Sequence, residues 1–168
     1  MMRRQLQGSF RAPALLIPGL FLVLSLTAAK SRIDVVTTIP DLADIARTIG
    51  GDRVNVTSIA RGYQDSHFVD AKPSHIVKLQ KADLFVQVGL DMEIGWAPSL
   101  LVGARNPNIL WGAKGYVDAS RGVPVLQVPT LPAAQLRAEG DIHIYGNPHY
   151  WLDPENGKII ARNILEGL

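Results

Sequence analysis

The sequence predicts an α/β protein built on a parallel sheet with helices on both of its faces. Two observations support this prediction. Short runs rich in β-branched and aliphatic residues alternate along the chain with segments whose apolar residues recur at helical spacing. Glycine and proline stand at most of the junctions between these segments. Such alternation is typical of βαβ units, in which the strands are parallel and the helices cover the sheet.

The predicted strands are short and mostly apolar, as expected for strands buried on both sides. The first reads RIDVVTTI and ends at Pro40, and the third reads LFVQV and ends at Gly89. The four predicted strands cover residues 32–39, 54–59, 84–88 and 123–128.

The predicted helices lie between or after these strands. They cover residues 42–49, 73–82, 92–101 and 154–168. Pro98 places the continuity of the third in doubt, because proline interrupts a helix interior. Asp153 and Pro154 suit the N-cap and first position of the last helix. The apolar stripe of this helix, Ile159, Ile160 and Ile164, has no later element to cover it. We therefore expect that the chain is truncated or that the helix packs on something absent from the sequence.

Composition excludes several classes of function. There are no cysteines, so disulfides, thiolate metal sites and cysteine nucleophiles are excluded within this sequence. The formal charge of +2 depends on three arginines within the first eleven residues. Beyond residue 29 the chain has 14 basic and 15 acidic residues, which gives no electrostatic footprint for nucleic acid.

The N-terminus has the pattern of an export signal. Arginines precede an apolar run over residues 12–26, and small residues follow at positions 27–29. The run is short for a membrane span and contains two prolines. We expect residues 1–29 to be a signal peptide, with an uncleaved anchor as the alternative, and the remainder to work outside the cytoplasm.

The stretch GNPHYWLDP, residues 146–154, contains the most informative histidine. Pro148 restricts the backbone before His149, and the predicted start of a helix follows it. A histidine with so little freedom suits a pre-oriented ligand or base. The alternative is a structural histidine that bonds a loop carbonyl.

A second histidine, His67, follows a different strand. It lies in the aperiodic segment 61–72, after the second predicted strand. Because ligands of parallel sheets bind beyond the carboxyl ends of the strands, both loops can reach one crevice. The motifs HExxH, GxSxG, GxxxxGK[ST] and GxGxxG are all missing from the sequence. Histidines on separate loops fit a metal clamped between distant elements.

Two segments resemble one known family, the zinc and manganese substrate-binding proteins of ABC importers. GYQDSHFVDAKPSHIVKLQKADLFVQVGLDMEIGW, residues 62–96, is similar to the family's first metal-ligand segment. GNPHYWLDPENGKIIARNI, residues 146–164, is similar to the second. The opening VVTTIPDLADIARTIGGDRVNV resembles the family's first strand and helix.

The resemblance implies that His67 and His149 are metal ligands. Asp65 could accept a hydrogen bond from the far ring nitrogen of His67, and His143 could be an accessory site or a neutral loop residue. Ser66 stands where the family usually has proline, and His75 where it usually has an acid. The family completes its site from a second lobe. We therefore expect residues 1–29 to be the signal, 30–153 an N-terminal metal-binding lobe, and 154–168 the start of an interlobe helix.

The implied function is a periplasmic binding protein that captures Zn²⁺, or alternatively Mn²⁺, and delivers it to the permease and ATPase of an ABC importer. No enzyme activity is implied. Affinity should fall with acidity, because both histidines must be deprotonated to bind a metal. With only two ligands, we expect this chain to bind metal weakly or not at all. An exported metallohydrolase and a metal-independent adhesin-like lobe remain as alternatives.

Overall fold

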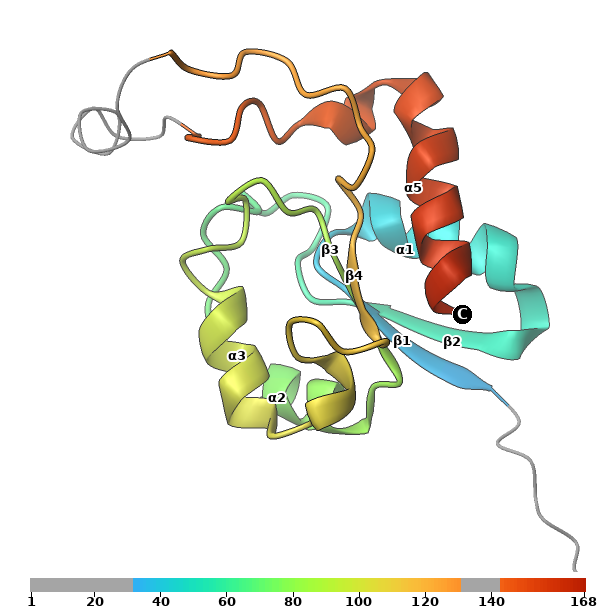
Figure 1. Ribbon diagram of the computed structural model, residues 1–168. Helices are drawn as coiled ribbons and strands as arrows, with labels where there is room; N and C mark the ends of the chain where they lie inside the picture. Colours follow the sequence, from blue (N-terminus) through green and yellow to red (C-terminus); the bar gives the residue numbers. More distant parts are fainter. Residues whose placement is uncertain (1–31, 131–142) are drawn as a thin grey trace, which may run out of the picture.

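The computed structural model describes residues 32–130 and 143–168, which form a sheet with helices on both faces (Figure 1). Four strands are parallel and lie in the order β2-β1-β3-β4. Their bounds are β1 Ile33–Thr37, β2 Val54–Ser58, β3 Leu84–Gln87 and β4 Tyr116–Asp118. The α/β prediction is confirmed.

Helices pack on the two faces in pairs. α1 (Pro40–Gly50) and α5 (Pro154–Gly167) contact each other on one face, and α2 (Pro73–Lys81) and α3 (Ala97–Ala104) contact each other on the opposite face. The described residues also include three short 3₁₀ helices: η1 (Gly51–Arg53), η2 (Pro107–Ile109) and η4 (Tyr150–Leu152).

Each face of the sheet has its own apolar core, because side chains alternate along every strand. Val35 of β1 points into the core under α1 and α5, and its neighbour Val36 points into the core under α2 and α3. In β3, Leu84 and Val86 join the first core and Phe85 the second. The strands are therefore buried on both sides, as their unbroken apolar runs predict.

The fourth strand is not where the sequence pattern placed it. Residues 123–128 are irregular, and β4 lies at Tyr116–Asp118 instead. Pro124 has no N–H for a sheet ladder, and Gln127 has a φ of +53°, which is far from an extended conformation. The prediction for 123–128 was therefore wrong.

Two expectations about helices also need correction. Pro98 does not interrupt a helix, because α3 begins at Ala97 and proline is tolerated in the first turn. The apolar stripe of α5 is covered within the described residues, since Ile160 and Ile164 are fully buried in the core that α1 shares. Asp153 caps α5 as predicted, accepting a hydrogen bond from the Glu155 N–H at 2.9 Å.

All four strands end at the same edge of the sheet, and this edge positions the candidate site. The loop after β2 contains His67, and the segment before η4 contains His143 and His149. The predicted signal peptide, residues 1–29, lies outside the described residues. Among the residues described, no helix is long and apolar enough to cross a membrane.

Candidate metal site

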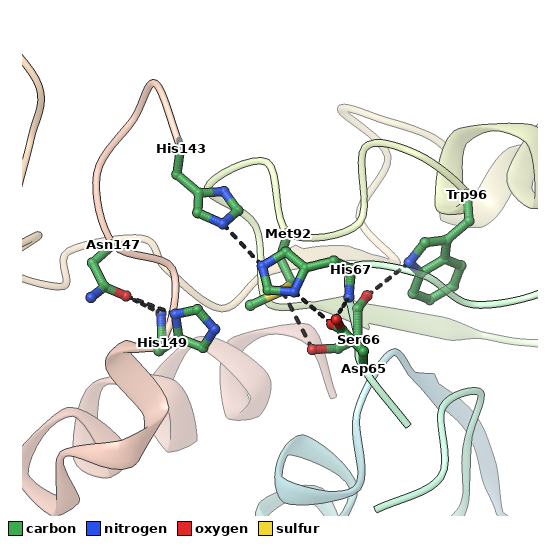
Figure 2. Close-up of polar contacts among 8 residues, drawn as sticks. All are labelled: Asp65, Ser66, His67, Met92, Trp96, His143, Asn147 and His149. Atoms are coloured by element: carbon green, nitrogen blue, oxygen red, sulfur yellow. Dashed lines mark hydrogen bonds and ion pairs between the residues drawn. The ribbon is translucent and has the colours of Figure 1, made fainter. Parts of the chain in front are cut away.

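Three histidines converge beyond the carboxyl ends of the strands (Figure 2). The ring centroid of His67 lies 5.0 Å from that of His143 and 5.4 Å from that of His149. The centroids of His143 and His149 are 6.3 Å apart. All three side chains line one pocket of about 370 Å³. The structure thus brings together the two predicted ligands and the predicted accessory histidine.

The loop that carries His67 is tied to the segment after β3. The Trp96 indole N–H donates to the Ser66 carbonyl at 2.9 Å, and the Ser66 hydroxyl lies 3.4 Å from the Met92 sulfur. Trp96 and Met92 are both buried, so these contacts hold the loop against the core. Ser66 therefore takes part in anchoring the loop at the position where the resembling family usually has proline.

Asp65 fixes the imidazole of His67. One carboxylate oxygen of Asp65 accepts hydrogen bonds from both the backbone N–H of His67, at 2.9 Å, and its ring Nδ1, at 2.7 Å. The backbone N–H bond is the main cause that lowers the pKa of Asp65, followed by the bond from the ring. The carboxylate therefore stays ionised and accepts both hydrogen bonds.

His149 is held by the buried residues on either side of it. Pro148 is buried, and the Tyr150 hydroxyl donates to the Val88 carbonyl at 2.7 Å, which ties this segment to the end of β3. Gly146 has a φ of +103°, a region that essentially only glycine occupies. A Cβ there would lie 2.9 Å from the Leu126 carbonyl. The glycine lets the His149 segment approach residues 125–128 closely.

Within the described part of the chain, the His149 ring faces a side-chain oxygen, whereas the structural alternative placed it on a main-chain carbonyl. The backbone N–H of His149 and its Nδ1 both face the side-chain oxygen of Asn147, at 2.9 and 2.8 Å. This arrangement repeats that of Asp65 and His67, two residues apart in each case. Burial lowers the pKa of His149, and the neighbouring His67 lowers it further. A lowered pKa keeps the imidazole neutral, the form that binds metal.

The partners define which ring nitrogens carry protons. A carboxylate oxygen and an amide oxygen can only accept hydrogen bonds, so Nδ1 of both His67 and His149 must be the donor. In the neutral rings the lone pair is then on Nε2. His67 Nε2 lies 2.9 Å from His143 Nε2 and accepts a hydrogen bond from it. These lone pairs are what a metal ion requires.

The contact between His67 and His143 is close to a metal-binding geometry but not identical to it. Two nitrogens bound to one tetrahedral Zn²⁺ at about 2.0 Å lie about 3.3 Å apart. The observed 2.9 Å is that of a hydrogen bond, and a small widening would admit an ion. Within the described residues no three His, Asp or Glu side chains already stand at coordinating positions. Binding therefore requires the rings to adjust.

Comparison with known proteins identifies the family. The sequence profile of the family described as "Zinc-uptake complex component A periplasmic" matches residues 35–168. The chain belongs to this family.

Two relatives match most of the chain in sequence. The manganese ABC transporter substrate-binding lipoprotein scaA of Streptococcus gordonii is 33% identical over 147 residues, covering 86% of this chain and 43% of the relative. PsaA of Streptococcus pneumoniae, with the same description, is 35% identical over 148 residues, covering 84% and 44%. The chain thus spans less than half the length of these relatives.

Two solved structures extend the comparison. A zinc-bound ZnuA lacking residues 138–173 of its own numbering is 27% identical with a TM-score of 0.62, covering 79% of this chain and 44% of that one. A manganese-bound periplasmic metal-binding protein of Candidatus Liberibacter asiaticus is 26% identical with a TM-score of 0.60, covering 79% and 43%.

Two residues that line the pocket with the histidines were not predicted from the sequence. Asn147 bonds His149, and Gln127 in turn bonds Asn147 at 2.7 Å. The spacing of Asn147, two residues before a histidine, matches that of Asp65 and could have indicated the first. Nothing local indicates Gln127, which lies 20 residues before its partner.

Proposed function

We propose that this chain is the metal-binding part of an extracytoplasmic binding protein that captures a divalent transition metal for an ABC permease and its ATPase. The observation that carries the proposal is the pair of histidines, His67 and His149, each with Nδ1 bonded and Nε2 left as the basic nitrogen. Family membership supports the same reading. In this proposal the described fold is the N-terminal lobe of the binding protein.

Zn²⁺ is the metal that we propose first. The described side chains that converge on the pocket offer imidazole nitrogens, which suit Zn²⁺ better than the harder Mn²⁺. Relatives are named for manganese and for zinc, so both metals belong in the test. We propose His67 and His149 as the principal ligands and His143 as a third.

The proposal is one of binding, without a reaction. A metallohydrolase needs an open metal position and a general base close to it. Asp65, the carboxylate that contacts the site, is already engaged by two donors from His67. An adhesin-like role would give no reason for two imidazoles to be fixed by the same device. Neither alternative is therefore favoured by the geometry.

Isothermal titration calorimetry of the full chain with Zn²⁺ and with Mn²⁺ tests the proposal. Two ligands alone would bind weakly or not at all, but His143 adds a third imidazole at the pocket, so we expect one equivalent of Zn²⁺ to bind. The His67→Ala, His149→Ala double variant should lose this heat. His75→Ala is the matched control, because His75 lies in α2 and does not line the pocket. Equal heats from the wild type and the double variant would refute the assignment of these ligands.

A further inference from the structure

The side chain of Asn147 is engaged at both ends of its amide. Its oxygen faces Nδ1 of His149 at 2.8 Å, and its NH₂ group donates to the side-chain oxygen of Gln127 at 2.7 Å. The backbone N–H of Asn147 also donates to the Leu126 carbonyl at 2.8 Å. Residues 126 and 127 are thus joined to Asn147 by one main-chain and one side-chain hydrogen bond.

An amide differs from a carboxylate in a way that matters here. Rotation of the Asp65 carboxylate exchanges one acceptor oxygen for another, so His67 always meets an acceptor. Rotation of the Asn147 amide would instead turn NH₂ toward Nδ1 of His149. That nitrogen would then have to accept, and the proton of the neutral ring would move to Nε2. A protonated Nε2 has no lone pair for a metal.

The productive orientation of this amide is held from both ends. The backbone N–H of His149 donates to the Asn147 oxygen at 2.9 Å, and the Gln127 side-chain oxygen accepts from the Asn147 NH₂ group at 2.7 Å. The Asn147 oxygen is thereby directed to His149. Gln127 has a φ of +53°, which is uncommon for a residue with a side chain. Such a conformation persists where surrounding contacts hold it, and the two hydrogen bonds from Asn147 reach the Gln127 side chain and the adjoining Leu126 carbonyl.

We propose that Gln127 and Asn147 are positioning residues that fix His149 in the Nδ1–H tautomer, leaving Nε2 to bind the metal. The role of Nε2 as a metal ligand rests on the proposed function. The tautomer itself is a property of the metal-free chain and can be measured without any metal.

The first test is a long-range ¹H–¹⁵N correlation spectrum of the metal-free full chain with ¹⁵N-labelled histidine, at a pH where the imidazoles are neutral. We expect the Nδ1–H tautomer for His149. Asn147→Leu preserves the size of the side chain but removes the acceptor, so His149 should shift toward Nε2–H. Asn147→Asp keeps an acceptor in place and should keep Nδ1–H. An unchanged tautomer in the Leu variant would overturn the proposal.

Gln127 offers a second variant with little risk to folding, because this residue is exposed. Gln127→Leu removes one of the two contacts that orient the Asn147 amide, and we expect a partial shift of His149 toward Nε2–H, smaller than that in Asn147→Leu. The tautomer of His67 should not change in any of these proteins and serves as the internal control. A single Nδ1–H species for His149 in Gln127→Leu would remove Gln127 from the proposal.

Zinc titration separates this inference from the proposed function. We expect Asn147→Leu to bind Zn²⁺ about 10- to 100-fold more weakly, the range for partners of metal-bound histidines. Asn55→Leu, on the exposed part of β2, is the control for loss of an asparagine. Unchanged zinc affinity in Asn147→Leu would overturn the positioning role. A wild type that shows Nδ1–H but binds no zinc would refute the proposed function and leave the tautomer assignment standing.

Discussion

At the scale of single residues, the site consists of imidazoles whose proton positions are set by their neighbours. Asp65 and Asn147 each place one oxygen on both the backbone N–H and the Nδ1 of the histidine two residues later. A free histidine can rotate and exchange tautomers, and it would lose both freedoms when it binds a metal. The same local device at two loops therefore prepares both His67 and His149.

His143 gives the first prediction at this scale. Its Nε2 lies 2.9 Å from Nε2 of His67, within hydrogen-bond distance of that nitrogen's lone pair. A metal ion placed between the two nitrogens would take both as ligands. We expect His143→Ala to weaken Zn²⁺ binding at least about tenfold, since even outer partners of metal ligands contribute that much. Competition against a chromogenic chelator measures the change.

The matched control for His143 is Tyr145→Ala, an exposed position on the same segment. Tighter zinc binding by His143→Ala would contradict the prediction. It would mean that His143 competes with the metal for His67 and is not itself a ligand.

At the scale of elements, the loops that carry the histidines are anchored to the end of β3. Trp96 and Met92 hold the His67 loop, and Tyr150 holds the His149 segment through the Val88 carbonyl. One strand end thus sets the relative position of two segments that are distant in sequence. Burial raises the pKa of the Tyr150 hydroxyl, so it remains a neutral donor.

Tyr150→Phe tests this anchoring. The change removes the hydroxyl and leaves the buried Val88 carbonyl without that donor, which costs about 1–3 kcal/mol of unfolding free energy. Urea unfolding monitored by circular dichroism measures the loss, with Tyr63→Phe as control because Tyr63 is 79% exposed. If Tyr150→Phe and Tyr63→Phe are equally stable, the anchoring is refuted.

Much of the fold at this scale could be predicted from the sequence. The first three strands and the first two helices have clear apolar periods and stop signals, whereas α3 begins at Ala97 and not at the predicted residue 92. β4 was missed because three residues are too few to show a period, and because the residues around Val125 alternate without forming a ladder. His67 and His149 were predicted from their segments. The convergence of His143 depends on a tertiary contact spanning 76 residues, which no local pattern reveals.

At the scale of the whole molecule, a buried carboxyl group lies at the same sheet edge. Glu93 is 3% exposed, and its two oxygens accept the N–H groups of Val88 and Gly89 at 2.8 and 3.1 Å. Burial raises the pKa of Glu93 from its ordinary value of 4.5 to about 6, and the charge of Asp118 also raises it. The folded state therefore binds this proton more tightly than the unfolded chain does.

Protonation of Glu93 stabilises the folded state. It adds about 2 kcal/mol to the unfolding free energy below pH 4.5, and most of this gain develops as pH falls from 7 through 6 toward 4.5. The gain is lost as pH rises again through 6. Glu93→Gln cannot titrate. We expect the stability of the wild type minus that of Glu93→Gln to rise by about this amount over the same range.

Urea unfolding at a series of pH values measures the difference in stability. Glu155→Gln reports the effect of the same substitution at an exposed helix position. A wild-type minus Glu93→Gln difference that stays constant from pH 7 to 4.5 would show that burial does not perturb Glu93.

The central claim is that imidazoles at the carboxyl edge of the sheet hold the metal through Nε2. Zinc K-edge X-ray absorption of the full chain with one equivalent of Zn²⁺ tests it most directly. We expect a first shell with nitrogen at about 2.0–2.1 Å and the outer-shell scattering of at least two imidazoles. That scattering should be absent from the His67→Ala, His149→Ala double variant. A first shell of oxygen alone, or an identical spectrum from the double variant, would contradict the account.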